Sequence, residues 1–143
     1  MIRHIKKMEW SQLLDLYAML HPDEPDPVFD PALWFRILED PHQHILVWEE
    51  DGQLVGSVTL VIIENLTRGG RPYGIVENLV VLPEHRRKGI ACALLTEAVN
   101  IAKEQRCYKV EAMSSYNEEA VMNMYAKAGF LPDIKTGLVA NLP

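Results

Sequence analysis

A basic, glycine-containing segment follows a predicted buried strand near the middle of the chain. The strand residues Leu79–Val81 lead into the run from Arg86 to Ala91, Arg-Arg-Lys-Gly-Ile-Ala, where a helical pattern begins. The first N–H groups of a helix have no partner within the helix, and the helix dipole places positive potential there. The small residues Gly89 and Ala91 leave this backbone open to close approach. The segment therefore suits a phosphate or pyrophosphate, although a solvated strand-to-helix turn would have the same composition.

Two strand carboxylates are candidates for proton transfer. Glu77 lies among apolar residues of a strand predicted over 74–82, where an ionised carboxylate is costly to bury without a partner or a cleft. Glu111 lies on a strand predicted over 108–113 and would face the same cleft if the two strands are neighbours. Glu77 also fits a structural role, paired with a nearby basic or amide group.

The histidines and cysteines form no metal-binding or disulfide pattern. No His-x-x-x-His, His-Glu or Cys-x-x-Cys spacing occurs. Cys92 falls on the apolar face of a predicted helix and Cys107 precedes a strand, so we expect both thiols to be packed and unreactive. The sequence thus predicts no metal.

The hydrophobic pattern predicts a mixed α/β domain built on one sheet. In chain order the predicted elements are a strand (2–5), two helices (10–20 and 31–38), three strands (45–50, 53–63 and 74–82), a helix (90–102), a strand (108–113), a helix (117–128) and a last strand that includes 138–140.

Local signals fix several boundaries of these elements. Asp51-Gly52 predicts a tight hairpin turn. The strand over 74–82 is apolar apart from Glu77 and Asn78, which predicts a central strand covered on both faces. Asn117 or Ser115 is the expected cap of the last helix.

Length and composition exclude several classes of protein. A chain of 143 residues predicts a single domain over 1–143. The net charge of −6 argues against non-specific nucleic-acid binding, and no apolar run reaches the ~20 residues that span a membrane. The basic N-terminal residues lead into no signal-peptide core, so we expect a cytoplasmic, reduced protein.

Two motifs resemble those of the GNAT superfamily of N-acetyltransferases. The run from Arg86 to Ala91 matches the family's Q/R-x-x-G-x-G/A motif, and the run from Met124 to Phe130 resembles its tyrosine helix, which ends in Gly-Phe. The resemblance covers the part of the chain from Gly74 to Phe130. It implies a GNAT-like fold of class α/β (α+β): a mixed, mostly antiparallel sheet flanked by helices, with a splayed pair of parallel strands that binds the coenzyme.

The resemblance also implies acetyl-CoA as cosubstrate. The strand backbone at Leu79–Val81 would bind the pantetheine arm, the N–H groups of 87–92 would bind the pyrophosphate, and the Val81 N–H would lie near the thioester oxygen. The implied coenzyme-binding residues are Leu79, Val80, Val81, Arg86, Arg87, Lys88, Gly89, Ile90, Ala91, Cys92, Asn117 and Tyr125. Asn117 lies eight positions before Tyr125, one more than in many relatives, so Glu118 is the alternative to it.

Catalytic roles follow from the same resemblance. Tyr125 would be the acid that protonates the leaving thiolate, and its alternative role is that of a core tyrosine. Glu77 would be the base, with Glu111 as the alternative, acting directly or through a water molecule.

The implied function is an acetyl-CoA-dependent N-acetyltransferase acting on a small primary amine in a ternary complex, with a homodimer as the common assembly. A coenzyme-A-binding regulatory or sensor module and an acetyltransferase of protein N-termini or lysines are the alternatives.

A weaker resemblance, over Gly74–Val81 and Cys107–Lys109, is to glucosamine 6-phosphate N-acetyltransferases, which tend to carry Glu-Asp where this chain has Glu77-Asn78. The acidic segment 23–30 lies where the family places its acceptor loop, and it is either an amine-attracting face or a solvated loop.

Overall fold

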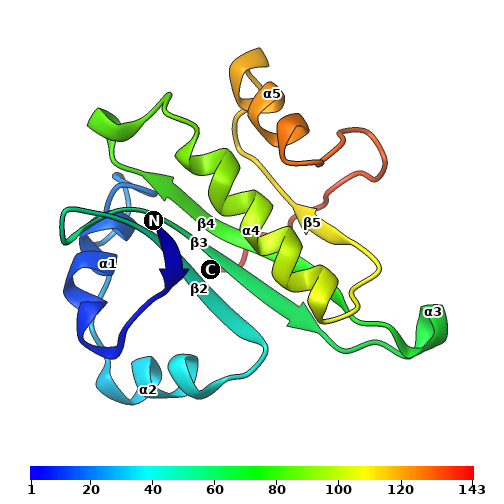
Figure 1. Cartoon of the computed structure of the whole chain (residues 1–143), viewed down its shortest axis with the longest axis horizontal. Helices are drawn as coiled ribbons and strands as arrows, with labels where there is room; N and C mark the ends of the chain where they lie inside the picture. Colours follow the sequence, from blue (N-terminus) through cyan, green and yellow to red (C-terminus); the bar gives the residue numbers. More distant parts are fainter.

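A five-stranded mixed sheet forms the centre of the computed structural model, which describes residues 1–143 (Figure 1). The strands follow one another in the sheet in chain order, and every neighbouring pair is antiparallel except the last, which is parallel. They are β1 (Ile2–His4), β2 (Gln43–Glu50), β3 (Gln53–Ile63), β4 (Tyr73–Val81) and β5 (Val110–Ala112). Asp51 and Gly52 have positive φ at the turn between β2 and β3, which confirms the predicted hairpin.

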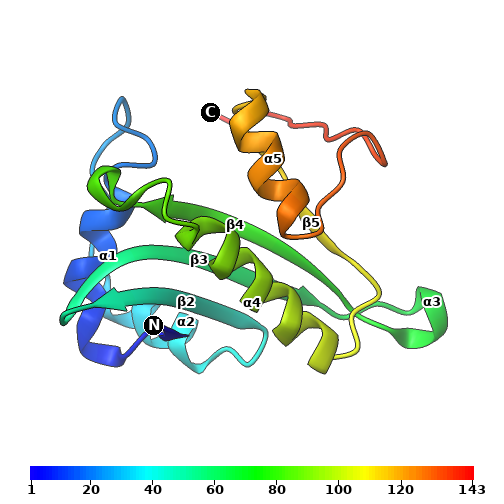
Figure 2. The same cartoon turned by 45° about the horizontal axis from the view of Figure 1, so that its top comes forward.

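Helices cover both faces of this sheet. Helices α1 (Trp10–Tyr17) and α2 (Pro31–Glu39) lie on one face, α4 (Ile90–Glu104) crosses the other, and α5 (Glu119–Lys127) lies beyond β5 (Figures 1 and 2). Three single turns complete the chain: η1 (Lys7–Glu9), α3 (Thr67–Gly70) and η2 (Pro83–His85). None of the helices is both long and apolar enough to cross a membrane.

Each face of the sheet has its own hydrophobic core. On the α4 side, Leu94 and Leu95 pack with Val58 and Leu60 of β3. On the α1 side, Leu13 and Leu16 belong to a second cluster with Val47, Leu54 and Val80. Strand β3 is buried on both faces because it contributes to both clusters. The architecture is the α/β fold predicted from the sequence.

The parallel pair β4–β5 is short and then separates. Pairing runs only from Gly74 opposite Val110 to Val76 opposite Ala112. Beyond that point β4 continues to Val81, whereas the chain after β5 turns away toward α5 (Figure 2). The structure thus confirms the splayed pair of strands, and residues 77–81 of β4 have no β5 neighbour.

A β-bulge lies where the two strands part. The pairing of β3 with β4 shifts between Ser57–Val80 and Thr59–Glu77, so that Asn78 and Leu79 together face Val58. Asn78 has a φ of 56°, in the left-handed region. The predicted central position of β4 is confirmed, but its predicted cover on both faces is interrupted at Glu77 and Asn78, which are exposed.

Two predictions for the C-terminal part are also wrong. Residues 130–143 contain no strand: Leu138 and Val139 are 88% and 72% exposed, and no strand lies beside them to complete a ladder. The predicted cap of α5 by Asn117 or Ser115 is absent, because Glu118 precedes the helix and no side chain caps it.

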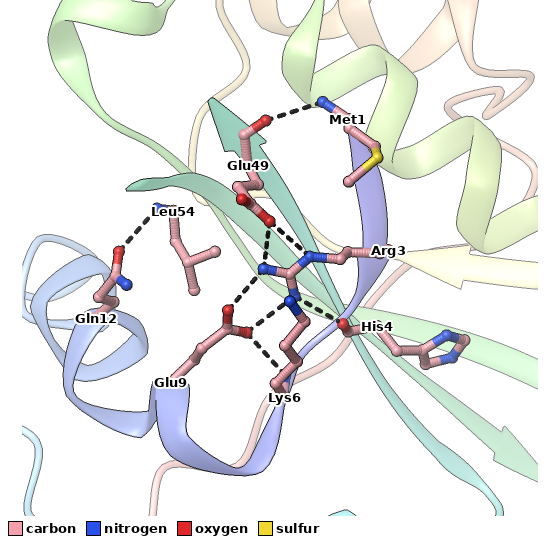
Figure 3. A network of polar contacts seen from close by, with 8 residues as sticks. All are labelled: Met1, Arg3, His4, Lys6, Glu9, Gln12, Glu49 and Leu54. Atoms are coloured by element: carbon pink, nitrogen blue, oxygen red, sulfur yellow. Dashed lines mark hydrogen bonds and ion pairs between the residues drawn. The ribbon is translucent and has the colours of Figure 1, made fainter. Parts of the chain in front are cut away.

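An arginine holds the N-terminal strand to the layer that carries α1 (Figure 3). Arg3 donates to both Glu9 carboxylate oxygens, at 2.6 and 2.9 Å, and to Glu49 Oε2 at 2.5 and 2.8 Å. Glu9 also accepts a bond from the Lys6 backbone N–H at 2.8 Å. The three ionised side chains thereby join β1, η1 and β2.

Candidate active site

The turn before α4 presents a free helix terminus. Strand β4 ends at Val81, η2 follows, and Arg87 and Gly89 have φ values of 61° and 80°. The Ala93 N–H donates to the Gly89 carbonyl at 3.0 Å, which is the first bond of the helical ladder. The N–H groups of residues 90–92 therefore have no partner within the helix and point outward with the positive end of its dipole.

A cavity of about 300 Å³ opens at this terminus. Arg86 and Arg87 are the arginines in its wall, and α5 closes the far side through Ala120, Val121 and Met124. Its remaining lining residues are Val81, His85, Gly89, Ile90, Ala91 and Cys92. The arginines and the free N–H groups converge on one space, so the cavity suits an anion.

Gly89 has a left-handed backbone conformation at this turn. A Cβ at this position would meet no atom within 4 Å, and the φ of 80° disfavours any other residue. The position thus favours glycine for its conformation, and a side chain there would project into open space beside the helix terminus.

The edge of β4 carries a backbone donor into the gap between the strands. The Leu82 N–H donates to Val55 of β3 at 2.8 Å. Because successive backbone groups alternate in direction along a strand, the Val81 N–H and carbonyl point away from β3. Arg86 Nε donates to that carbonyl at 3.0 Å, in agreement with this direction. The Val81 N–H is therefore directed to the side on which β5 no longer pairs.

Tyr125 lies half-buried on α5, close to β4. Burial raises the pKa of its hydroxyl above the ordinary value, and the negative charge of Glu77 adds to the rise. Phe130 packs edge-on against the ring, with the centroids 5.9 Å apart. Tyr125 thus keeps its proton at neutral pH and has a carboxylate in its surroundings.

The two candidate carboxylates differ in their partners. Glu77 occupies the first position of β4 without a β5 neighbour, and it is exposed. Glu111 lies opposite Ile75, within the paired part of the strands, and forms an ion pair with Lys109. Glu77 is therefore the carboxylate at the opening of the strands.

The other predicted site residues lie in several places. Leu79 is half-buried next to the bulge, whereas the Val80 side chain is buried in the cluster on the α1 side. Lys88 is exposed and does not line the cavity. Asn117 and its alternative Glu118 are exposed in the segment before α5 and are not in the cavity wall either.

A second pocket, of about 250 Å³, lies on the opposite face of the sheet between α1, α2 and the segment 27–30. Its polar groups include Tyr17, Thr59 and Asn78, with the Tyr17 hydroxyl 3.3 Å from Thr59 Oγ1. Burial raises the pKa of Tyr17, and hydrogen bonds from Thr59, Asn78 and Ser57 oppose the rise. Sequence reasoning missed this cluster, and the signal for it was the two polar residues Ser57 and Thr59 within a mostly apolar strand.

The sequence model of the Acetyltransferase (GNAT) family matches residues 7–130. The chain belongs to this family. It is therefore a member of a group of acyltransferases, as the sequence motifs predicted. No group of three or more His, Cys, Asp or Glu side chains in the structure could hold a metal ion.

Individual relatives agree with this assignment. Glucosamine 6-phosphate N-acetyltransferase of Trypanosoma brucei brucei is 40% identical over 79 residues, 55% of this chain and 52% of that protein, so the match spans about half of its length. A protein of Agrobacterium tumefaciens str. C58 that is assigned as an acetyltransferase has 32% identity and a TM-score of 0.92, with 99% of each chain covered. An aminoglycoside N-acetyltransferase in complex with CoA shares the fold at a TM-score of 0.77 and 19% identity, with 100% of each chain covered.

Proposed function

We propose that this protein transfers the acetyl group of acetyl-CoA to a primary amine by direct attack within a ternary complex. The proposal rests on three features that lie together at the splayed end of β4. They are the cavity at the α4 terminus, the Val81 N–H, and the side chains of Glu77 and Tyr125. Membership of the GNAT family supports the same reaction.

The cavity at α4 fits the pyrophosphate of the coenzyme. The N–H groups of Ile90, Ala91 and Cys92 would bind its oxygens, with charge supplied by Arg87. Arg86 already donates to the Val81 carbonyl, so it also holds the turn against β4. Acetyl-CoA supplies the acetyl group as an activated thioester.

The unpaired edge of β4 fits an extended, amide-containing arm. The backbone groups of Leu79 and Val81 would bond such an arm as an added strand does. The Val81 N–H would then donate to the oxygen on which negative charge develops during attack, as a donor of an oxyanion hole does.

Glu77 and Tyr125 are suited to the two proton transfers. An alkylamine with a pKa near ~10.4 arrives as its ammonium form and must lose a proton before it can attack. Glu77 would accept that proton, directly or through water, because its carboxylate is exposed and free of the kind of ion pair that Lys109 forms with Glu111. Tyr125, which keeps its proton at neutral pH, would donate to the leaving sulfur.

Thiol release with a panel of amines tests the proposal. We expect Tyr125→Phe to lower kcat at least about tenfold without changing the affinity for acetyl-CoA. Tyr108→Phe, which removes a hydroxyl near the start of β5, is the control and should retain full turnover. Equal kcat for the wild type and Tyr125→Phe would remove Tyr125 from the chemistry.

The same assay distinguishes the other functions. If acetyl-CoA binds in calorimetry but no amine causes release of the CoA thiol, the protein is a sensor module. Release of the thiol with peptides alone would indicate a protein acetyltransferase. Loss of kcat in Glu111→Gln but not in Glu77→Gln would make Glu111 the base. Roles for Lys88 and Asn117 in coenzyme binding, a homodimer and a cytoplasmic location stay predictions from the sequence.

A further inference from the structure

The pocket on the α1 side differs from the coenzyme cavity in its chemistry. Ten of its 15 lining residues are hydrophobic. Trp10 stacks on Phe29 with the ring centroids 3.9 Å apart, and Trp34 is fixed by a bond from its Nε1 to the Lys7 carbonyl at 2.9 Å. The pocket is therefore a preformed apolar space with aromatic walls.

Its size fits a small apolar body. The volume is about 250 Å³, and an apolar cavity of about 150 Å³ is enough to bind benzene. A phenyl ring with a short alkyl chain would fill this space, and its burial would supply the affinity.

The charge of the pocket excludes a phosphate. No Lys, Arg or His lines it, and its single charged residue is Asp30. Asp30 Oδ1 accepts from the N–H groups of Ala32 and Leu33, at 3.0 and 3.1 Å, so this carboxylate is held in place at the start of α2. Phosphate groups are bound by Arg, Lys or backbone N–H groups, whereas a fixed carboxylate repels a phosphate.

The pocket borders the strand at which the acetyl group would be transferred. Thr59, in its wall, lies opposite Glu77 in the β3–β4 register, and Asn78 of the same wall follows Glu77 in the chain. The β4–β5 pairing ends at Val76, immediately before these residues. The opening between β4 and β5 thus begins beside the wall of the apolar pocket.

We propose that the acceptor is a primary amine on an apolar, phenyl-sized body, and that amino-sugar phosphates are poor acceptors. This substrate class rests on the proposed function, since it names the amine for the same site. The apolar body would lie among the aromatic side chains, and the amine would lie toward Asn78 and Glu77.

A matched pair of acceptors tests the proposal. In 2-phenylethylamine the phenyl ring replaces the hydroxyl of ethanolamine, so we expect a kcat/KM about 30-fold higher or more. Faster acetylation of glucosamine 6-phosphate than of 2-phenylethylamine would overturn the proposal while leaving the acetyltransferase activity intact.

Two substitutions on α2 test whether the acceptor binds in this pocket. Leu33 lines the pocket and is 43% exposed, whereas Phe35 lies outside it and is 53% exposed. We expect Leu33→Gln to weaken calorimetric binding of 2-phenylethylamine about tenfold, and Phe35→Gln to leave it unchanged. If this difference holds but no amine is acetylated, the pocket assignment stands and the proposed activity fails. Absence of 2-phenylethylamine binding, or equal effects of the two variants, would overturn the assignment.

Discussion

At the scale of single residues, Gly89 combines a backbone requirement with a functional one. Its φ of 80° costs any L-residue about 1 kcal/mol or more, and a methyl group there would stand beside the free N–H groups of α4. We expect Gly89→Ala to lower the free energy of unfolding by about 1 kcal/mol and to raise the KM for acetyl-CoA. Denaturant unfolding and steady-state kinetics measure the two effects.

Gly52 provides the matched control for this substitution. It has a φ of 79° and lies in the β2–β3 turn, where an added Cβ would likewise meet no atom within 4 Å. Gly52→Ala should therefore lose about the same stability, with no change in KM. A rise in KM in both variants would show that the effect of Gly89→Ala is general destabilisation.

The acidity of Tyr125 depends on a neighbouring charge. Deprotonation of a tyrosine creates a negative charge, so the Glu77 carboxylate disfavours it and raises the pKa of Tyr125, in addition to the effect of burial. We expect Glu77→Gln to lower the pKa of Tyr125, measured from tyrosinate absorbance as the difference between each protein and its Tyr125→Phe counterpart. Glu111→Gln should leave that pKa in place, and an equal fall in both variants would contradict the assignment of Glu77.

At the scale of elements, Arg3 joins β1 to the layer that carries α1. Loss of its bonds to Glu9 and Glu49 would leave two partly buried carboxylates without their cation. We expect Arg3→Met to lower the free energy of unfolding by about 2 kcal/mol at neutral pH. Arg36→Met, at an exposed position of α2, should cost less than about 0.5 kcal/mol.

The effect of Arg3→Met should depend on pH. The hydrogen bonds from Arg3 hold the pKa of Glu9 below its usual value. A lowered carboxyl pKa contributes stability above the unfolded pKa of ~4.3, and that contribution is lost as the pH falls through the folded value. The difference between wild type and Arg3→Met should therefore shrink in acid denaturation series below about pH 4. A constant difference across that range would mean that Arg3 acts through packing alone.

The elements also show which parts of the site could be predicted from sequence. The turn from Arg86 to Gly89 is determined by adjacent residues, so its motif predicted both the turn and the helix that begins after it. The bulge at Asn78 depends on the register between β3 and β4, which no local pattern specifies. The apolar pocket depends on the stacking of Trp10 on Phe29, residues on separate segments. The strand predicted near the C-terminus is absent, because apolar residues such as Leu138 form a strand only beside a neighbouring strand with which their backbone can form hydrogen bonds.

At the scale of the whole molecule, burial is unevenly distributed along the chain. Every buried residue lies at or before Cys107, and the segment from Tyr108 to Pro143 has none. Segments with few buried contacts open at lower free energy than the core. The part that contains β5 and α5 is therefore expected to open locally while β3 and α4 stay folded.

Hydrogen exchange tests this difference and its link to the coenzyme. Amides of α5 should exchange faster than those of α4 in the free protein. Because Val121 and Met124 line the cavity proposed for the coenzyme, addition of CoA should slow exchange in α5. Amides of α1, on the other face, serve as the internal control. Unchanged exchange in α5 with saturating CoA would remove this helix from the coenzyme site.

The early end of the β4–β5 pairing has a further consequence for the solution behaviour of the protein. An unpaired strand edge on the outside of a sheet recruits strands of other molecules and promotes aggregation. Here the unpaired edge of β4 lies in a slot between the strands, with α5 as its outer wall. The helix α5 therefore stands between this edge and the strands of other molecules. We therefore expect removal of the chain after Ala112 to expose this edge of β4 and to promote association between molecules.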